Sequence, residues 1–172
     1  MDMVRAAKAK EAAKSSKRKS DDEARAKAEL AARMMAEAKE QGDRHWKIVK
    51  ESATLVNETT NPEVFFSRYN LVLEHLERLA GLECTGIYDS SPELPSEAFE
   101  RIDALFPTAT NRFLDRALEA AQKHADSLKT ENGKKAAILR FFDSMDKYII
   151  HMDSESVVYF DELREKHCPK AN

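Results

Sequence analysis

The sequence predicts an all-α protein: a helical bundle of five to six amphipathic helices with a charged N-terminal helical arm. Only 4 of the 172 residues are glycine, while 42% are hydrophobic and 34% are charged, a balance that is typical of helices. Apolar residues recur at helical spacings of three and four along most of the chain. The one Asn-Gly pair, Asn132-Gly133, has no alternating apolar runs beside it and therefore does not indicate a hairpin.

The best-defined expected helix covers residues 61–82. Asn61 is suited to cap its first turn, Pro62 fits the first helical position, and Gly81 is expected to form a C-cap. One helical face carries Phe65, Tyr69, Val72, Leu76 and Leu79. Because this apolar arc is wide, we expect the helix to lie at the centre of the bundle.

Residues 1–42 form a separate charged arm, rich in alanine, lysine and glutamate, with no glycine or proline before Gly42. These residue types favour helix. We expect residues 1–20 to be frayed or disordered and residues 21–41 to form an exposed helix. A thin coiled-coil stripe is made by Ala24, Ala28, Ala31, Met35 and Ala38. Alanine buries little area, so we expect the arm to become ordered against a partner.

The bundle domain is expected over residues 43–168, followed by a tail at 169–172. Either a bend or cap at Gly42-Asp43 or one continuous long helix would join the arm to this domain. Its first helix carries Trp46, Val49, Ala53 and Val56 on one stripe. The short connection to the central helix favours an antiparallel helical hairpin.

The later helices are predicted from their capping residues and apolar stripes. The expected caps are Ser96, then Thr108 or Thr110, then Thr130, and finally Asp153 or Ser154. The helix that carries Ile138 to Met152 is heavily apolar, and we expect it to be the mate of the central helix. Pro107 is expected to end the short helix that starts after Ser96.

The net charge of −3 hides an asymmetry between the two ends of the chain. Residues 1–20 hold seven basic and two acidic side chains, whereas residues 51–172 hold 14 basic and 22 acidic ones. The candidate contacts for a partner or for nucleic acid are Lys14, Lys17, Arg18 and Lys19. Phosphate binding by such a cluster would depend strongly on salt, but the arm has no aromatic side chains for base stacking before Trp46.

The sequence carries no recognisable catalytic, cofactor-binding or metal-binding motif. None of the five histidines follows an acidic residue by three positions, and Cys84 and Cys168 each stand alone. No Gly-x-Ser-x-Gly elbow and no Gly-x-Gly loop is present. We therefore expect no enzyme activity, no cofactor and no small-molecule substrate. An active site assembled from scattered His, Cys and acidic residues is the remaining enzymatic alternative.

Two widely separated cysteines indicate a reducing, cytoplasmic setting without a disulfide framework. The N-terminus lacks the apolar region of a signal peptide. No apolar run approaches the roughly 20 residues that a membrane span needs. The sequence thus predicts no membrane association.

Two segments carry a resemblance to a known kind of module. The first is LVNETTNPEVFFSRYN at residues 55–70, and the second comprises FLDRA at 113–117, SLKT at 127–130 and RFF at 140–142. They resemble a helical module of uncharacterised proteins of Gram-positive bacteria and their phages, over residues 46–166. Some relatives have a zinc ribbon before the module, where this chain has its charged arm and no cysteine pairs. The resemblance implies a fold and a bacterial or phage/prophage context, with no established activity.

Together these features predict a non-enzymatic protein–protein interaction module. We expect a bacterial or phage/prophage accessory protein that engages an unknown protein partner through its arm or an exposed groove. The alternative is an accessory protein that binds nucleic acid through the basic tip at residues 1–20.

Overall fold

The computed structural model describes residues 2–86, 88 and 94–168, with side chains described from Lys17 onward. Over these residues it contains six α-helices, one short 3₁₀ helix and no strand, so the predicted all-α bundle is confirmed. The elements are α1 (Asp2–Glu58), α2 (Pro62–Cys84), α3 (Pro95–Ala104), α4 (Phe106–Asp126), α5 (Glu131–Asp146), η1 (Ile149–His151) and α6 (Ser154–His167).

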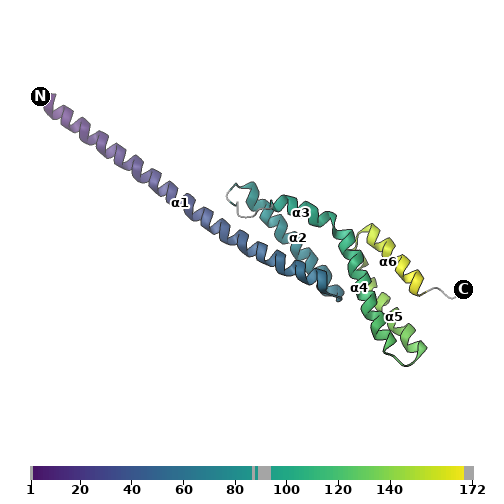
Figure 1. Ribbon diagram of the computed structural model, residues 1–172. Coiled ribbons are helices and arrows are strands. Elements are labelled where there is room, and N and C mark those ends of the chain that lie inside the picture. Colours follow the sequence, from purple (N-terminus) through teal and green to yellow (C-terminus); the bar gives the residue numbers. More distant parts are fainter. Residues whose placement is uncertain (1, 87, 89–93, 169–172) are drawn as a thin grey trace.

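Helix α1 is one continuous helix of 57 residues whose N-terminal part extends away from the rest of the molecule (Figure 1). It passes through Gly42 in helical conformation, so of the two expected arrangements the bend or cap at Gly42-Asp43 is wrong. A Cβ atom at Gly42 would lie 2.0 Å from Cε2 of Tyr88, which is itself buried. Gly42 therefore serves the close approach of an aromatic ring and does not end the helix.

Helix α2 packs antiparallel against the C-terminal part of α1, as the sequence predicts (Figure 1). The side-chain oxygen of Asn61 accepts hydrogen bonds from the backbone N–H groups of Glu63 and Val64, at 2.9 and 3.3 Å, which confirms the cap. The predicted C-cap at Gly81 is wrong, because α2 continues through it to Cys84. All five residues of the predicted apolar face, Phe65, Tyr69, Val72, Leu76 and Leu79, are buried.

The starts of α3 and α4 are set by proline and not by hydroxyl side chains. Helix α3 begins at Pro95, whose fixed φ suits a first helical position, so the predicted cap at Ser96 is wrong. Helix α4 begins at Phe106, ahead of Thr108 and Thr110, and neither threonine caps it. The hydroxyl of Thr110 instead donates a hydrogen bond to the carbonyl of Phe106, 2.9 Å away, within the first turn.

Helices α5 and α6 begin as predicted but pack differently. Thr130 caps α5 by accepting a hydrogen bond from the N–H of Gly133 at 3.1 Å, and Asp153 caps α6 by accepting from Ser156 at 2.9 Å. The expected pairing of the Ile138–Met152 segment with the central helix holds only at the end of the segment, where Tyr148 stacks on Phe66 of α2 with ring centroids 5.5 Å apart. Helix α5 itself packs mainly against α4, while α1 lies beside α2.

The core consists of two clusters at the two ends of the body. In the first, the ring of Phe65 stacks on Phe113, with centroids 4.3 Å apart, and α5 and α6 add Phe142 and Phe160. The second joins α1, α2 and α3 through Val49, Val72, Leu76, Leu79, Tyr88 and Ala98. Among the residues that the structure describes, no residue before Trp46 belongs to either cluster. The outer part of α1 therefore contributes nothing to the core.

Candidate functional site

The outer part of α1 is a free helix surface. Every residue from Lys17 to Glu37 is exposed, including the large apolar side chains Leu30, Met34 and Met35, with 60, 49 and 56% of their surface accessible. Ala38, the residue after Glu37, is half-buried. Apolar side chains that gather on one stretch of exposed helix indicate a contact surface more often than single exposed residues do.

Of these three large apolar side chains, Met35 belongs to a regular stripe that runs along α1 with alternating spacings of four and three, here called the heptad seam. Its outer half, the outer seam, consists of Ala24, Ala28, Ala31, Met35 and Ala38. Its inner half, the inner seam, consists of Gly42, His45, Val49, Ser52 and Val56. Because the helix is unbroken at Gly42, both halves lie on the same side of α1.

The inner seam is the surface that α1 packs against α2 and its neighbours. Val49, Ser52 and Val56 are buried, and the ring of Tyr88 covers Gly42. Toward the N-terminus, the same side of the helix continues into the outer seam, where Ala38 is half-buried and Ala24, Ala28, Ala31 and Met35 are exposed. The outer seam is therefore a surface of the kind that packs against a helix, but no helix of the described part of the chain packs against its exposed residues.

The predicted contact residues lie at the outer end of this surface. Lys17, Arg18 and Lys19 are exposed, and the side chain of Lys14 lies outside the described residues. Successive residues of an α-helix are about 100° apart, so three consecutive basic side chains point to different sides. They form a basic tip around the helix and do not converge on one point.

A pair of histidines lies within the hairpin at the inner seam. The Nδ1 atoms of His45 and His75 are 2.7 Å apart, so one ring must donate a hydrogen bond and the other accept it. Burial lowers the pKa of both rings, helped by the positive charge of Arg78 and, for His45, by His75. Sequence reasoning missed this pair because the residues are 30 positions apart, although the antiparallel register of the hairpin would have aligned them.

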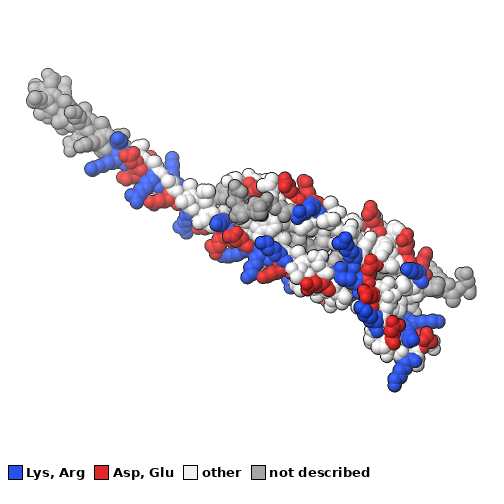
Figure 2. Space-filling model, viewed as in Figure 1, with Lys and Arg blue, Asp and Glu red and all other residues white. Residues whose placement is uncertain are grey.

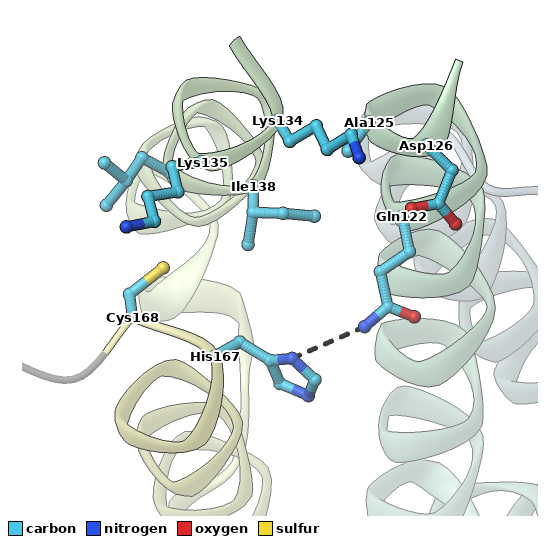
Figure 3. A pocket seen from close by; sticks show the side chains of 9 residues that line it. Gln122, Ala125, Asp126, Lys134, Lys135, Ile138, His167 and Cys168 are labelled. Carbon is cyan, nitrogen blue, oxygen red and sulfur yellow. Dashed lines mark hydrogen bonds between the residues drawn. The ribbon is translucent and has the colours of Figure 1, made fainter. Parts of the chain in front are cut away.

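A cleft of about 590 Å³ opens where α4, α5 and α6 meet (Figure 3). Its lining combines the apolar Ala125, Ile138 and Leu139 with the polar Gln122, Asp126, Lys134, Lys135, His167 and Cys168. Figure 3 shows Gln122 and His167 extending toward each other from α4 and α6, with Nε2 and Nδ1 3.4 Å apart. Burial raises the pKa of the Cys168 thiol, which keeps it protonated and poorly nucleophilic. Sequence reasoning missed this cleft because three separate helices form it.

The described residues offer no metal site and no membrane span. No three His, Cys, Asp or Glu side chains in the described part of the chain are placed to hold a metal ion together. No helix over residues 2–86 and 94–168 combines the length and apolar character needed to cross a membrane. Comparison of the chain with protein-family models, with curated proteins and with solved structures finds no match of any of the three kinds.

Proposed function

We propose that this protein is a non-enzymatic interaction protein that docks another protein along the outer seam of α1. One observation carries the proposal: a single regular seam runs from Ala24 to Val56, and its residues from Ala24 to Met35 are exposed although the inner half is covered. A surface that already packs against a helix in one half is chemically suited to do so in the other.

The rest of the molecule supports this role by holding the arm in place. The inner seam is anchored to α2, and Arg116 of α4 donates a hydrogen bond to the carbonyl of Val56, 2.9 Å away. A helix that continues from an anchored segment avoids the cost of nucleation that an isolated helix would meet. A partner therefore meets a largely preformed surface, which lowers the entropy cost of binding.

The proposed setting follows from the sequence. The resemblance to the helical module of Gram-positive bacterial and phage proteins suggests a bacterial or phage/prophage accessory protein. Both cysteines are free, with Cys84 exposed, which suits a cytoplasmic location.

A matched pair of variants tests the proposal in cells of the source organism. In the full-length chain, Ala28→Glu with Ala31→Glu places two charges in the outer seam. The control, Ala26→Glu with Ala36→Glu, places the same charges on the other sides of the same exposed helix. Crosslinking and affinity capture should recover a partner with the wild type and the control but not with the seam variant. Equal capture by both variants, or equal loss, would contradict the proposal.

Nucleic-acid binding through the basic tip is the second candidate. The exposure of Lys17, Arg18 and Lys19 favours it, while the acidic excess of residues 51–172 opposes it. It predicts that affinity for duplex DNA falls steeply with salt and is lost when Lys14, Lys17, Arg18 and Lys19 are all replaced by alanine. Binding that responds to neither change would rule this candidate out.

A further inference from the structure

The charges along the two edges of the outer seam all have one sign. One edge is made by the residues that directly follow Lys17, Ala24, Ala31 and Ala38, and it carries Arg18, Arg25, Ala32 and Lys39. The other edge is made by the residues that directly precede Asp21, Ala28, Met35 and Gly42. It carries Ser20, Lys27, Met34 and Gln41. Between residues 17 and 41, no acidic side chain lies on either edge.

The acidic residues of the same segment are placed elsewhere on the helix. Asp22, Glu23, Glu29, Glu37 and Glu40 lie on the remaining sides, and Asp21 interrupts the line of the seam beyond Ala24. In Figure 2 the basic and acidic side chains of this segment accordingly occur side by side along the helix. The total charge of the segment therefore conceals a basic border of the seam, with three positive charges on one edge and Lys27 on the other.

The basic edge residues are available to a partner. Arg25 forms an ion pair with Glu29 at 3.0 Å, in which the side chains are 81 and 68% exposed. Such exposed pairs within one helix contribute little to stability, so the guanidinium can exchange partners easily. Lys27 and Lys39 are likewise exposed.

The size of the side chains adds a second constraint on the partner. In the hairpin, α1 buries the medium-sized or small Val49, Ser52 and Val56, whereas α2 buries the bulkier Leu76 and Leu79. The outer seam is smaller still, with alanine at four of its five positions. A helix that fills this surface must supply large aliphatic side chains, as α2 does at the inner seam.

From these two features we propose that the outer seam binds an amphipathic helix of another protein, with large aliphatic residues on its seam and Asp or Glu on both edges. This inference rests on the proposed function and specifies the chemistry of its partner. Acidic edges would pair with Arg18, Arg25, Lys27 and Lys39 across the interface. A second copy of the same segment is disfavoured, because basic edges would face basic edges in either orientation.

The test uses the full-length protein and labelled helical peptides of roughly three heptads. The first peptide has Leu at its seam positions and Glu at both edges, and the second has Leu and Lys. A third keeps the Glu edges but has Ser in the seam. Fluorescence anisotropy should show binding of the Leu/Glu peptide at least about ten-fold tighter than that of either other peptide, because both apolar contact and charge pairing are needed.

A charge-inverted variant and its matched control locate the binding. Arg25→Glu with Lys27→Glu inverts the edges and should weaken binding of the Leu/Glu peptide about ten-fold or more. Lys19→Glu with Arg33→Glu changes the net charge equally, on the side opposite the seam, and should change affinity less than about three-fold. Each double variant also removes one exposed ion pair, to Glu29 or to Glu37, so the two are balanced.

Several results would overturn the inference. Equal binding of the Leu/Glu and Leu/Lys peptides, no binding of any peptide, or equal sensitivity to both charge variants would exclude an acidic helix. If the peptide with Ser in the seam bound as tightly as the Leu/Glu peptide, and duplex DNA competed with both, the surface would be a general site for polyanions. Dimerisation of the protein alone that Ala28→Glu with Ala31→Glu abolishes would make a second copy the occupant. If the peptide results excluded an acidic helix but Ala28→Glu with Ala31→Glu still abolished capture of a cellular partner, the proposed function would stand and only the inferred chemistry of the partner would fall.

Discussion

Replacing Gly42 by alanine should destabilise the protein, although the same change in a helix interior normally stabilises. Alanine gains about 1 kcal/mol over glycine through helix propensity. At Gly42, however, the new methyl carbon would lie 2.0 to 2.6 Å from three ring carbons of Tyr88, so the ring must leave its buried position. Losing that burial costs about 2–3 kcal/mol, and the net loss in free energy of unfolding should be about 1–2 kcal/mol.

Gly81 provides the matched control, because it also lies inside a helix but a methyl group added there would have nothing within 4 Å. Gly81→Ala should therefore stabilise by about 0.5–1 kcal/mol. Urea unfolding followed by the fluorescence of Trp46, the single tryptophan, measures both changes. In a Tyr88→Ala background, Gly42→Ala should become stabilising. If Gly42→Ala alone stabilises as much as Gly81→Ala, the packing of Tyr88 on Gly42 is refuted.

Three further predictions concern the body. Phe65→Ala should cost about 3–5 kcal/mol in the same assay, because the ring is fully buried against Phe113; a loss below about 1 kcal/mol would contradict this burial. Because the pKa values of His45 and His75 are lowered from 6.5, the unfolded chain binds protons before the folded chain does on acidification, and the free energy of unfolding should fall below pH 6.5. His75→Gln should make this fall with pH less steep. An unchanged pH dependence would show that the histidine pair is not its cause. Asn61→Ala should cost about 1 kcal/mol through loss of the α2 cap, and a neutral effect would argue against it.

Much of the fold could be predicted from sequence because caps and apolar stripes are local signals. Asn61, Thr130 and Asp153 cap helices where expected, and the stripe of α2 is buried. The errors arose where tertiary packing decides the outcome. Gly42 looked like a helix break because its neighbour Tyr88 is far away in the sequence and therefore invisible in a local pattern.

The candidate site was only half visible in the sequence. The stripe from Ala24 to Ala38 could be identified, but its continuation through Gly42 into the packed hairpin depends on knowing that α1 is unbroken. Only that continuity shows that the outer seam is the unfilled half of a packing surface. The basic border likewise becomes apparent only after the seam fixes which residues lie on its edges.

Amide hydrogen–deuterium exchange along α1 of the full-length chain tests most directly whether the outer seam is an unfilled packing surface. We predict strong protection over residues 42–58, where α2 covers the helix, and markedly weaker protection over residues 17–37, which only the hydrogen bonds of the helix itself hold in the free protein. Adding the Leu/Glu peptide should protect residues 17–37 and leave 42–58 unchanged. Equal protection of both segments in the free protein would show that the outer seam is already covered, which would contradict its role as a free docking surface.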